Sequence, residues 1–300
     1  MTGARTMTPL FEGGAYFECP RWHDGRWWLS DFYRHAVFTY DAEGREEQVM
    51  EVEGQPSGLG WLPGGDLLVV SMKDRRVLRR SADGTVTEHA DVSAITGGHL
   101  NDMIVDRDGR AYAGNFGFDL MGGGEPAVAS LVRVDPDGTA TVAAEDLWFP
   151  NGMVITDDGT LIVAETFAAR FTAFRIAGDG TLADRRVWAQ VEPSPEPADT
   201  HTMLGAVTFA PDGCALDAEG HVWAANALGG VVCRVAPGGR IVEEIAIPNG
   251  LGVFACGLGA EDGRTLIACA APDFDEAARS AAREAVLLTT IVDVPRAGLP

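Results

Sequence analysis

The chain has 300 residues and a mass of 31.8 kDa, a size that fits one large domain or two small ones. Hydrophobic residues make up 46% and charged residues 22%, which excludes a disordered chain. The 23 Lys and Arg stand against 44 Asp and Glu, and the resulting net charge of −21 disfavours binding to nucleic acid and to anionic membrane surfaces.

A turn motif recurs six times along the chain. In each copy a turn ending in Gly is followed by a short apolar or aromatic run, as in HDGRWWLSD and DDGTLIVAE. Such turns predict β-hairpins, because Gly supplies the positive φ angles that tight hairpin turns require. The six copies occupy residues 23–31, 63–71, 107–115, 157–165, 218–226 and 261–269, and their turn glycines are Gly25, Gly65, Gly109, Gly159, Gly220 and Gly263.

A second set of turns follows the first five copies. These turns lie at Gly44, Gly84, Gly138, Gly180 and Gly239, so that each unit predicts four strands joined by two turns and a connection. The first-set glycines are 40, 44, 50, 61 and 43 residues apart, which is the spacing of propeller blades. We therefore predict an all-β fold, a six-bladed β-propeller with four-stranded blades, as a single domain over residues 1–300. A β-sandwich or two all-β domains would not explain six copies of one turn.

Several segments between and after these units have expected structures of their own. Residues 114–120 (GNFGFDL) and 121–124 (MGGG) are expected to form a lid or a pocket wall, and the Pro-rich run 191–200 predicts a surface loop. Residues 275–284 (DEAARSAARE) predict a helix inserted in the last unit. Residues 285–294 predict the last strand, which we expect to pair with the N-terminal segment, since an open ring would leave strand edges exposed.

The chain shows no sign of a membrane span, a secretion signal or a disulfide framework. Its longest apolar run, 285–292, is much shorter than the about 18 residues that a span needs, and the N-terminal segment lacks an apolar signal core. The cysteines are odd in number, widely spaced and without a C-x-x-C pair. We therefore predict buried thiols in a reducing, cytoplasmic environment. The five are Cys19, Cys214, Cys233, Cys256 and Cys269.

Oxygen-bearing side chains recur at one place in successive units. Asn101, Asn151 and Asp212 each precede a turn glycine by 8 residues, Glu18 precedes one by 7, and Ser57 takes this place in the second unit. Equivalent positions of propeller blades are related by rotation about the axis. If this position begins the innermost strands, the side chains converge at the mouth of the central channel.

Two carboxylates and two amides in one small volume are typical ligands of a hard cation. We predict one divalent cation bound by Glu18, Asn101, Asn151 and Asp212, with Ca²⁺ favoured and Mg²⁺, Mn²⁺ or Zn²⁺ as the other candidates. Without a cation the carboxylates would repel each other, and one would take up a proton. The alternative is that Asn, Asp and Ser cap turns at strand starts. The shared register favours the cation site.

Two histidines are weaker candidates for a pocket. His99 lies two residues before Asn101, so strand alternation turns both side chains to the same side. We predict that His99 and Asn101 contact the substrate, while a surface or structural role for His99 stays open. His201 lies in the loop before the fifth unit, from which it could reach a pocket.

Two sequence features together resemble the SMP-30/gluconolactonase/LRE-like family, also called the regucalcin family. They are the opening FECPRWHDGRWWLSDFYRHAVFTYD and the ordered blocks HLND, FPNGMVI and APDGCALDAEGHVWAAN, over roughly residues 11 to 270. The resemblance implies a six-bladed propeller, one divalent metal at the axis, and hydrolysis of lactones or, in some relatives, of organophosphates. It also implies that the family's metal-binding Glu, Asn and Asp match Glu18, Asn151 and Asp212, and that its further Asn matches Asn101.

The chain departs from the family pattern at two places. His99 stands where sugar-lactonase members carry an Arg that contacts the substrate. Asn101 is followed by Asp102 and Met103, where those members have N-D-G. The loss of the Arg disfavours an aldonolactone as the substrate.

The function that these residues favour is a metal-dependent hydrolase that opens a small-molecule lactone or ester. The cation would polarise the carbonyl, and Asp212, the predicted catalytic residue, would act as general base or orient the attacking water. One alternative is a phosphotriesterase of the diisopropylfluorophosphatase type, in which Asp212 attacks phosphorus. Another is a non-catalytic propeller that binds Ca²⁺ or a protein partner. A third is a His99 pocket shaped for an aromatic or fused lactone.

Overall fold

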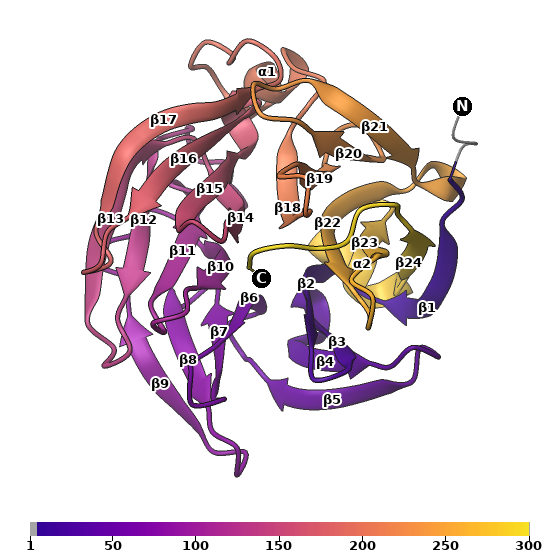
Figure 1. Cartoon of the computed structure of the whole chain (residues 1–300), viewed down its shortest axis with the longest axis horizontal. Helices are drawn as coiled ribbons and strands as arrows, with labels where there is room; N and C mark the ends of the chain where they lie inside the picture. The colour runs from indigo at the N-terminus through magenta and orange to yellow at the C-terminus, as the bar shows by residue number, and fades with distance from the viewer. Residues whose placement is uncertain (1–4, 300) are drawn as a thin grey trace.

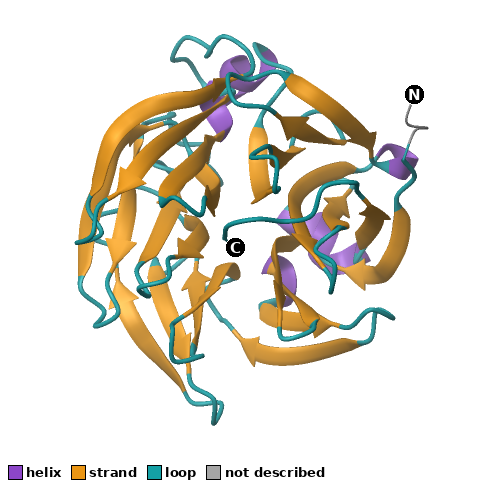
Figure 2. Cartoon of the chain, viewed as in Figure 1, coloured by secondary structure: helices purple, strands orange, loops and turns teal. Residues whose placement is uncertain are grey.

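The computed structural model describes residues 5–299, which form six four-stranded antiparallel sheets arranged as a ring. Figure 1 looks down the axis of this ring and shows the sheets following one another in chain order. Strands dominate, and the helices are few and short (Figure 2). The predicted all-β six-bladed β-propeller is confirmed. The single domain predicted over residues 1–300 stays a prediction, and residues 1–4 and 300 lie outside the described residues.

Each of the first five blades contains four strands that are consecutive in sequence and run in order from the axis to the rim (Figure 1). The blades are, in chain order, β2 (Phe17–His23), β3 (Arg26–Asp31), β4 (Ala36–Tyr40) and β5 (Glu46–Glu51); β6 (Pro56–Trp61), β7 (Leu67–Ser71), β8 (Arg76–Arg80) and β9 (Val86–Asp91); β10 (Leu100–Val105), β11 (Ala111–Asn115), β12 (Ala129–Val134) and β13 (Ala140–Leu147); β14 (Pro150–Ile155), β15 (Thr160–Glu165), β16 (Arg170–Ile176) and β17 (Leu182–Gln190); β18 (Pro211–Leu216), β19 (Val222–Asn226), β20 (Val231–Val235) and β21 (Ile241–Ala246).

The sixth blade joins the two ends of the chain. Its strands are β22 (Gly252–Gly259), β23 (Thr265–Ala271), β24 (Ala285–Ile291) and, outermost, β1 (Thr8–Gly14). Because β1 pairs with β24, the first strand covers an edge that the last strand would otherwise expose. The predicted closure of the ring by the N-terminal segment is confirmed.

The predicted hairpin turns and the burial of the strands follow from the sequence. All six first-set turn glycines have positive φ angles, from 68° at Gly263 to 90° at Gly65. Inner strands such as β10 and β14 are buried at every residue, whereas the outer strands β5 and β9 are mostly exposed. The innermost strands are therefore held between neighbouring blades, and their ends are the fixed positions from which a site at the axis is built.

The helices lie in the connections between strands. Helix α2 (Glu276–Ala282) falls within the predicted helical stretch and is N-capped by Asp275, whose carboxylate accepts a hydrogen bond from the Ala278 amide. The predicted loop at 191–200 is confirmed as far as Asp199, which caps a helix that the sequence did not predict, α1 (Thr200–Gly205). Short 3₁₀ turns are η1 (Phe32–Arg34), η2 (Thr166–Ala168) and η3 (Pro248–Gly250). No helix among residues 5–299 has the length and apolar character needed to cross a bilayer.

The C-terminal tail covers the end of the channel that lies away from the starts of the inner strands. After β24 the tail runs to the middle of the ring (Figure 1). There Leu299 exchanges backbone hydrogen bonds with Ile155, the last residue of β14, and Ala297 donates to the carbonyl of Leu216, the last residue of β18. The tail therefore ties the fourth, fifth and sixth blades together, and leaves the opposite end of the channel as the place for a site.

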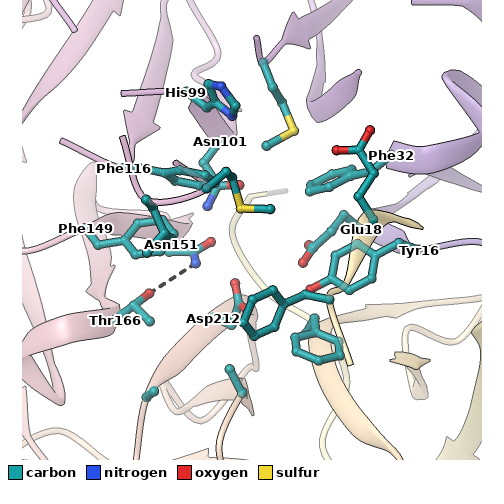
Figure 3. Close-up of a pocket in the computed structure, with 18 of the residues that line it drawn as sticks. Tyr16, Glu18, Phe32, His99, Asn101, Phe116, Phe149, Asn151, Thr166 and Asp212 are labelled. Carbon is teal, nitrogen blue, oxygen red and sulfur yellow. Dashed lines mark hydrogen bonds between the residues drawn. The ribbon is translucent and has the colours of Figure 1, made fainter. Parts of the chain in front are cut away.

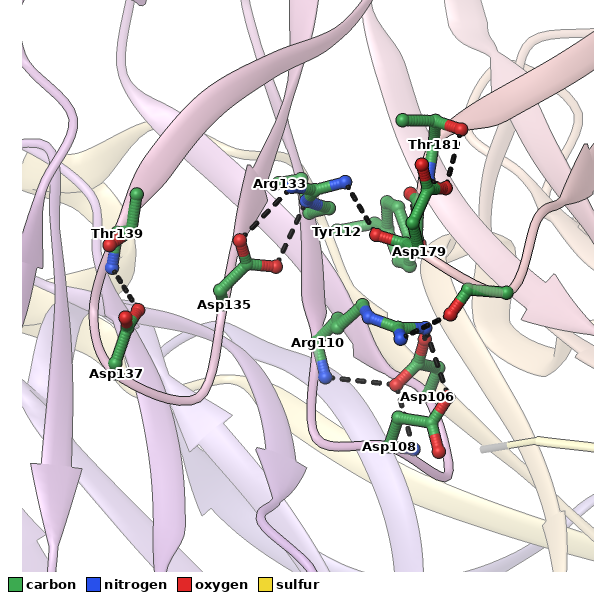
Figure 4. Close-up of polar contacts among 12 residues, drawn as sticks. Asp106, Asp108, Arg110, Tyr112, Arg133, Asp135, Asp137, Thr139, Asp179 and Thr181 are labelled. Carbon is green, nitrogen blue, oxygen red and sulfur yellow. Dashed lines mark hydrogen bonds and ion pairs between the residues drawn. The ribbon is translucent and has the colours of Figure 1, made fainter.

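Polar contacts also join neighbouring blades near that covered end. Figure 4 shows Arg110 and Arg133 of the third blade extending toward the β16–β17 turn of the fourth blade. Arg110 donates to the carbonyl of Gly178 at 2.8 Å, and Arg133 donates to the carbonyl of Asp179 at 3.2 Å. These contacts satisfy turn carbonyls and hold the two blades together.

Candidate active site

A cavity of about 290 Å³ lies at the uncovered end of the channel, and every blade contributes to its lining (Figure 3). Its floor holds the four residues that the sequence predicted as metal ligands, one from each of four inner strands. Glu18 lies on β2, Asn101 on β10, Asn151 on β14 and Asp212 on β18. Figure 3 shows their side chains turned toward one shared space. The fold therefore brings the four side chains together, as the sequence predicted.

Local backbone irregularity aims these side chains. The pairing register shifts between Leu100 and Met103, and the shifted stretch contains Asn101; Asn151 and Asp212 lie in the same kind of shift in their own strands. In β2 the register shift lies between Glu18 and Arg21, so it begins after the floor residue. Glu18 is also the floor residue that precedes its turn glycine by 7 residues, where the other three precede theirs by 8. Such bulges are frequent next to active sites because they re-aim a side chain out of the sheet pattern.

The two carboxylates lie in an environment that disfavours their charge. Burial, together with the nearby charges of Asp212 and Asp102, raises the pKa of Glu18 well above its usual range. Burial, with a contribution from the charge of Asp102, raises the pKa of Asp212 to about 8. The sequence predicted that one floor carboxylate takes up a proton when no cation is bound. A bound divalent cation would offset the repulsion between the two carboxylates.

Hydrogen bonds orient the two amides of the floor. The Asn151 amide nitrogen donates to the Thr166 hydroxyl at 3.1 Å, and Thr166 in turn donates to the carbonyl of Pro211 at 2.8 Å. Because the Thr166 hydroxyl holds the amide nitrogen, the carbonyl oxygen of Asn151 faces the space that the four floor residues share. Asn101 accepts a hydrogen bond from Ser57 at 3.4 Å, so Ser57 supports the floor without joining it.

The donor set suits a hard divalent cation. Among residues 5–299 there is no cluster of three or more His, Cys, Asp or Glu side chains placed to hold a metal ion. The floor combines two carboxylates with two amides, and these oxygens match the preferences of Ca²⁺, Mg²⁺ or Mn²⁺. The four residues fit the predicted cation, and their role as its ligands remains a prediction.

A buried ion pair adjoins the floor. The Arg21 Nη2 donates to the Asp102 carboxylate at 2.7 Å, and both side chains are only 3% exposed. Arg21 follows Glu18 by three residues, and Asp102 follows Asn101 directly. No sequence motif pointed to Arg21, and Asp102 agrees with the family's N-D-G pattern, from which this chain departs at Met103. The ion pair could not be predicted from the sequence, because 81 positions separate the two residues.

The two histidine candidates have different outcomes. His99 lines the cavity with Asn101, as strand alternation predicted, and its ring centroid is 5.7 Å from that of Phe116. Burial, with the charge of Lys73, lowers the pKa of His99, so the imidazole is neutral at pH 7. His201 is exposed on α1 and does not line the cavity. The suggestion that His201 reaches the pocket is wrong, because α1 turns Met203 and Leu204 inward instead.

The upper part of the cavity is formed mainly by apolar residues. Within the predicted wall segments 114–120 and 121–124, Phe116, Leu120 and Met121 line the cavity. The buried aromatic residues of the lining come from four blades, and single sequence positions did not reveal them: Tyr16, Phe32, Phe116, Phe149, Phe167 and Phe254.

Comparison with known proteins identifies the family. Residues 17–271 match the family model described as SMP-30/Gluconolactonase/LRE-like region. The chain belongs to this family. The resemblance stated from the sequence motifs is thus confirmed over most of the chain.

Proteins similar to this chain include two that are named as lactonases. The pentonolactonase XacC of Haloferax volcanii is 28% identical over 237 residues, which are 77% of this chain and 74% of that protein. The 6-deoxy-6-sulfogluconolactonase of Pseudomonas putida is 29% identical over 170 residues, 56% of this chain and 52% of the relative, so the match spans about half of that protein. The crystal structure of regucalcin, a calcium-binding protein from Agrobacterium tumefaciens, has a TM-score of 0.79 at 20% identity, with 99% of this chain and 97% of that chain covered. At this identity the structural similarity shows the shared propeller fold.

Proposed function

We propose that this protein is a divalent-metal-dependent lactonase, which adds water to the carbonyl carbon of a lactone and so opens the ring. The observation that carries the proposal is the convergence of Glu18, Asn101, Asn151 and Asp212 on the floor of a cavity at the propeller axis. The relatives named as lactonases support the reaction class.

The floor residues have distinct roles in the proposed reaction. Glu18, Asn101, Asn151 and Asp212 would hold the cation, with Ca²⁺ the favoured ion. A divalent cation held there would supply Lewis-acid polarisation of the carbonyl oxygen. Asp212 accepts a proton from the attacking water or orients that water. Thr166 keeps the Asn151 amide in place through its hydrogen bond.

His99 and Asn101 position the substrate in this proposal. His99 lies in the cavity wall, above the floor residue Asn101 in Figure 3. As a neutral imidazole it can donate or accept one hydrogen bond. It therefore suits an uncharged lactone ring or its ester oxygen.

Substitution of the floor carboxylates tests these roles. In Glu18→Gln and Asp212→Asn we expect kcat to fall by about 100-fold or more, because each change removes a charged oxygen from the reaction site. The assay follows hydrolysis of a lactone panel with a pH indicator, after treatment with chelator and return of Ca²⁺, Mg²⁺, Mn²⁺ or Zn²⁺. Calorimetric titration of the same ions measures their binding, and circular dichroism checks the fold.

Asp157→Asn is the matched control, since Asp157 is 72% exposed on the covered end of the propeller. This variant should keep wild-type kcat. Wild-type kcat in either floor variant would contradict the assigned roles. Faster hydrolysis of a phosphotriester than of every lactone would replace the proposal with the phosphotriesterase alternative. Tight cation binding without turnover of either class would favour the non-catalytic propeller.

A cytoplasmic location also remains our proposal. It is supported by the five cysteines, which are all buried as free thiols.

A further inference from the structure

Two groups of aromatic rings flank the polar floor of the cavity. On one side the ring centroids of Phe116 and Phe149 are 4.7 Å apart, and those of Phe149 and Phe167 are 5.3 Å apart. On the other side the Tyr16 ring lies 5.3 Å from Phe32 and 5.0 Å from Phe254. Figure 3 shows Phe116 and Phe149 facing Tyr16 and Phe32 across the floor. A substrate that reaches the floor therefore lies between aromatic surfaces.

Several polar groups of the wall are already paired with other groups of the protein. Glu276 accepts hydrogen bonds from the Gln55 amide at 2.9 Å and from the Lys73 ammonium at 3.1 Å. The Thr166 hydroxyl donates to the carbonyl of Pro211 and accepts from Asn151. These pairings take up part of the hydrogen-bonding capacity of the wall, while the His99 imidazole and the Tyr16 hydroxyl, which also line the cavity, stay open to a substrate.

The entrance to the cavity carries large exposed apolar side chains beside the Lys73–Glu276 ion pair. Met121, Leu228 and Phe274 line the cavity and are 46%, 44% and 58% exposed. They come from the third, fifth and sixth blades, so three separate connections place a large apolar side chain at one opening. Exposed apolar side chains that gather in this way mark a surface that binds something apolar.

We propose that the substrate of this site is a lactone with an apolar alkyl or aryl substituent, and not a hydroxyl-rich sugar lactone. This inference rests on the proposed lactonase function and names its substrate class. The carbonyl end of the substrate occupies the floor, and the substituent lies between the aromatic groups and extends toward Met121, Leu228 and Phe274. Hydroxyl groups on the substituent would lose their water against mostly apolar walls, which disfavours the binding of a hydroxyl-rich ring.

Three lactones with the same six-membered ring test the proposal. They are δ-valerolactone, δ-nonalactone, which adds a butyl group, and glucono-δ-lactone, which adds hydroxyl groups. We expect kcat/KM, divided by the uncatalysed rate of each lactone, to be at least about tenfold higher for δ-nonalactone than for δ-valerolactone, and lowest for glucono-δ-lactone. A highest value for glucono-δ-lactone would overturn the inference and leave the lactonase proposal standing. Hydrolysis of none of the three by the metal-loaded protein would contradict the lactonase proposal itself.

The binding of lactams, which the enzyme would not hydrolyse, tests the apolar pocket independently of the reaction. Calorimetry with the metal-loaded protein should show 6-butyl-2-piperidone binding at least about fivefold more tightly than 2-piperidone, because the butyl group meets apolar walls. Equal affinities would contradict an apolar subsite, whatever the turnover results are.

Substitutions at the entrance locate the subsite. In Leu228→Ser and Phe274→Ser we expect KM for δ-nonalactone to rise about three- to tenfold, and to rise several times more than KM for δ-valerolactone. Ile291→Ser is the matched control, because Ile291 is as exposed as Phe274 at 58% but lies on β24 outside the cavity lining. Kinetic parameters of the entrance variants that match those of Ile291→Ser would overturn the placement of the substituent.

Discussion

Arg21 and Asp102 lie beside the floor of the site, and loss of either side chain would leave the other as an unpaired buried charge. Their side chains form an ion pair that is almost completely buried, and Asp102 directly follows the candidate ligand Asn101 while Arg21 follows Glu18 by three residues. The Arg21 Nε and the Asp102 Oδ2 have no hydrogen-bond partner among the described residues. A buried pair of this kind is costly to break from one side, because the remaining charge stays buried without its partner.

The substitution Asp102→Ala should therefore destabilise the protein strongly. We expect the free energy of unfolding to fall by about 3–5 kcal/mol, as is typical when one partner of a buried pair is removed. Urea denaturation followed by tryptophan fluorescence measures this change. Asp102→Asn, which keeps a hydrogen-bond acceptor for Arg21, should lose less.

A surface pair supplies the control for this prediction. Arg107 and Asp157 also join two blades at an N–O distance of 2.7 Å, but their side chains are 68% and 72% exposed. Asp157→Ala should lower the free energy of unfolding by less than about 1 kcal/mol, because water screens the exposed charges. Equal losses in Asp102→Ala and Asp157→Ala would show that burial of the Arg21 pair is unimportant.

At the scale of elements, the site depends on how closely the inner strands approach one another. Gly152 follows Asn151 in β14, and a Cβ atom at Gly152 would overlap the Asp212 carbonyl oxygen of β18. The same Cβ would lie 2.8 Å from the Cys214 amide nitrogen. Glycine at this position lets the strands that carry Asn151 and Asp212 lie side by side.

The substitution Gly152→Ala should push these two strands apart. We expect the free energy of unfolding to fall by about 1–3 kcal/mol, as for other overpacked positions, and kcat to fall with it because Asp212 is displaced. Chemical denaturation and the lactone assay measure the two effects.

Gly178→Ala is the matched control for the strand prediction. A Cβ at Gly178 meets no atom within 4 Å, and its backbone is outside the positive-φ region. The free energy of unfolding of Gly178→Ala should stay unchanged or rise by up to about 1 kcal/mol. Unchanged stability and activity in Gly152→Ala would disprove the close approach of β14 and β18.

On the scale of the whole molecule, closure of the ring keeps the five cysteines away from solvent. All five are buried, and burial raises the pKa of each thiol. Both effects lower reactivity, since the thiolate is the species that reacts. The pairing of β1 with β24 and the contacts of the tail with β18 hold the sixth and fifth blades, which contain four of the five thiols.

Thiol reactivity therefore reports on the closed ring. With a disulfide reagent at mildly alkaline pH, we expect fewer than one thiol per native chain to react within minutes, and all five to react after unfolding in urea. The variant Val187→Cys adds a thiol at a position that is 53% exposed, and it should react at once in the native protein. Rapid reaction of several thiols in the folded wild-type chain would contradict the closed ring.

The blade count, the closure of the ring and the register of the floor residues could all be predicted from the sequence. Hairpin turns are local, so each D-G or G-G turn could be recognised within a few residues of the chain. Repetition then supplied the long-range information, because rotation about one axis brings equivalent positions such as Asn151 and Asp212 together. The candidate cation site was predictable for this reason, while its function remains a proposal.

The surroundings of those residues could be seen only in the folded chain. The Arg21–Asp102 pair, the support of Asn151 by Thr166 and the position of the C-terminal tail join segments that no repeat relates. The aromatic walls were not predicted, although Tyr16 and Phe149 each lie two residues before a floor residue, and Phe32 and Phe116 each lie seven residues after a turn glycine. Contacts between segments that no repeat relates depend on packing between blades, and such packing leaves no periodic trace in the sequence. The register of the repeat thus places the floor of the site, and packing between blades shapes the cavity above it.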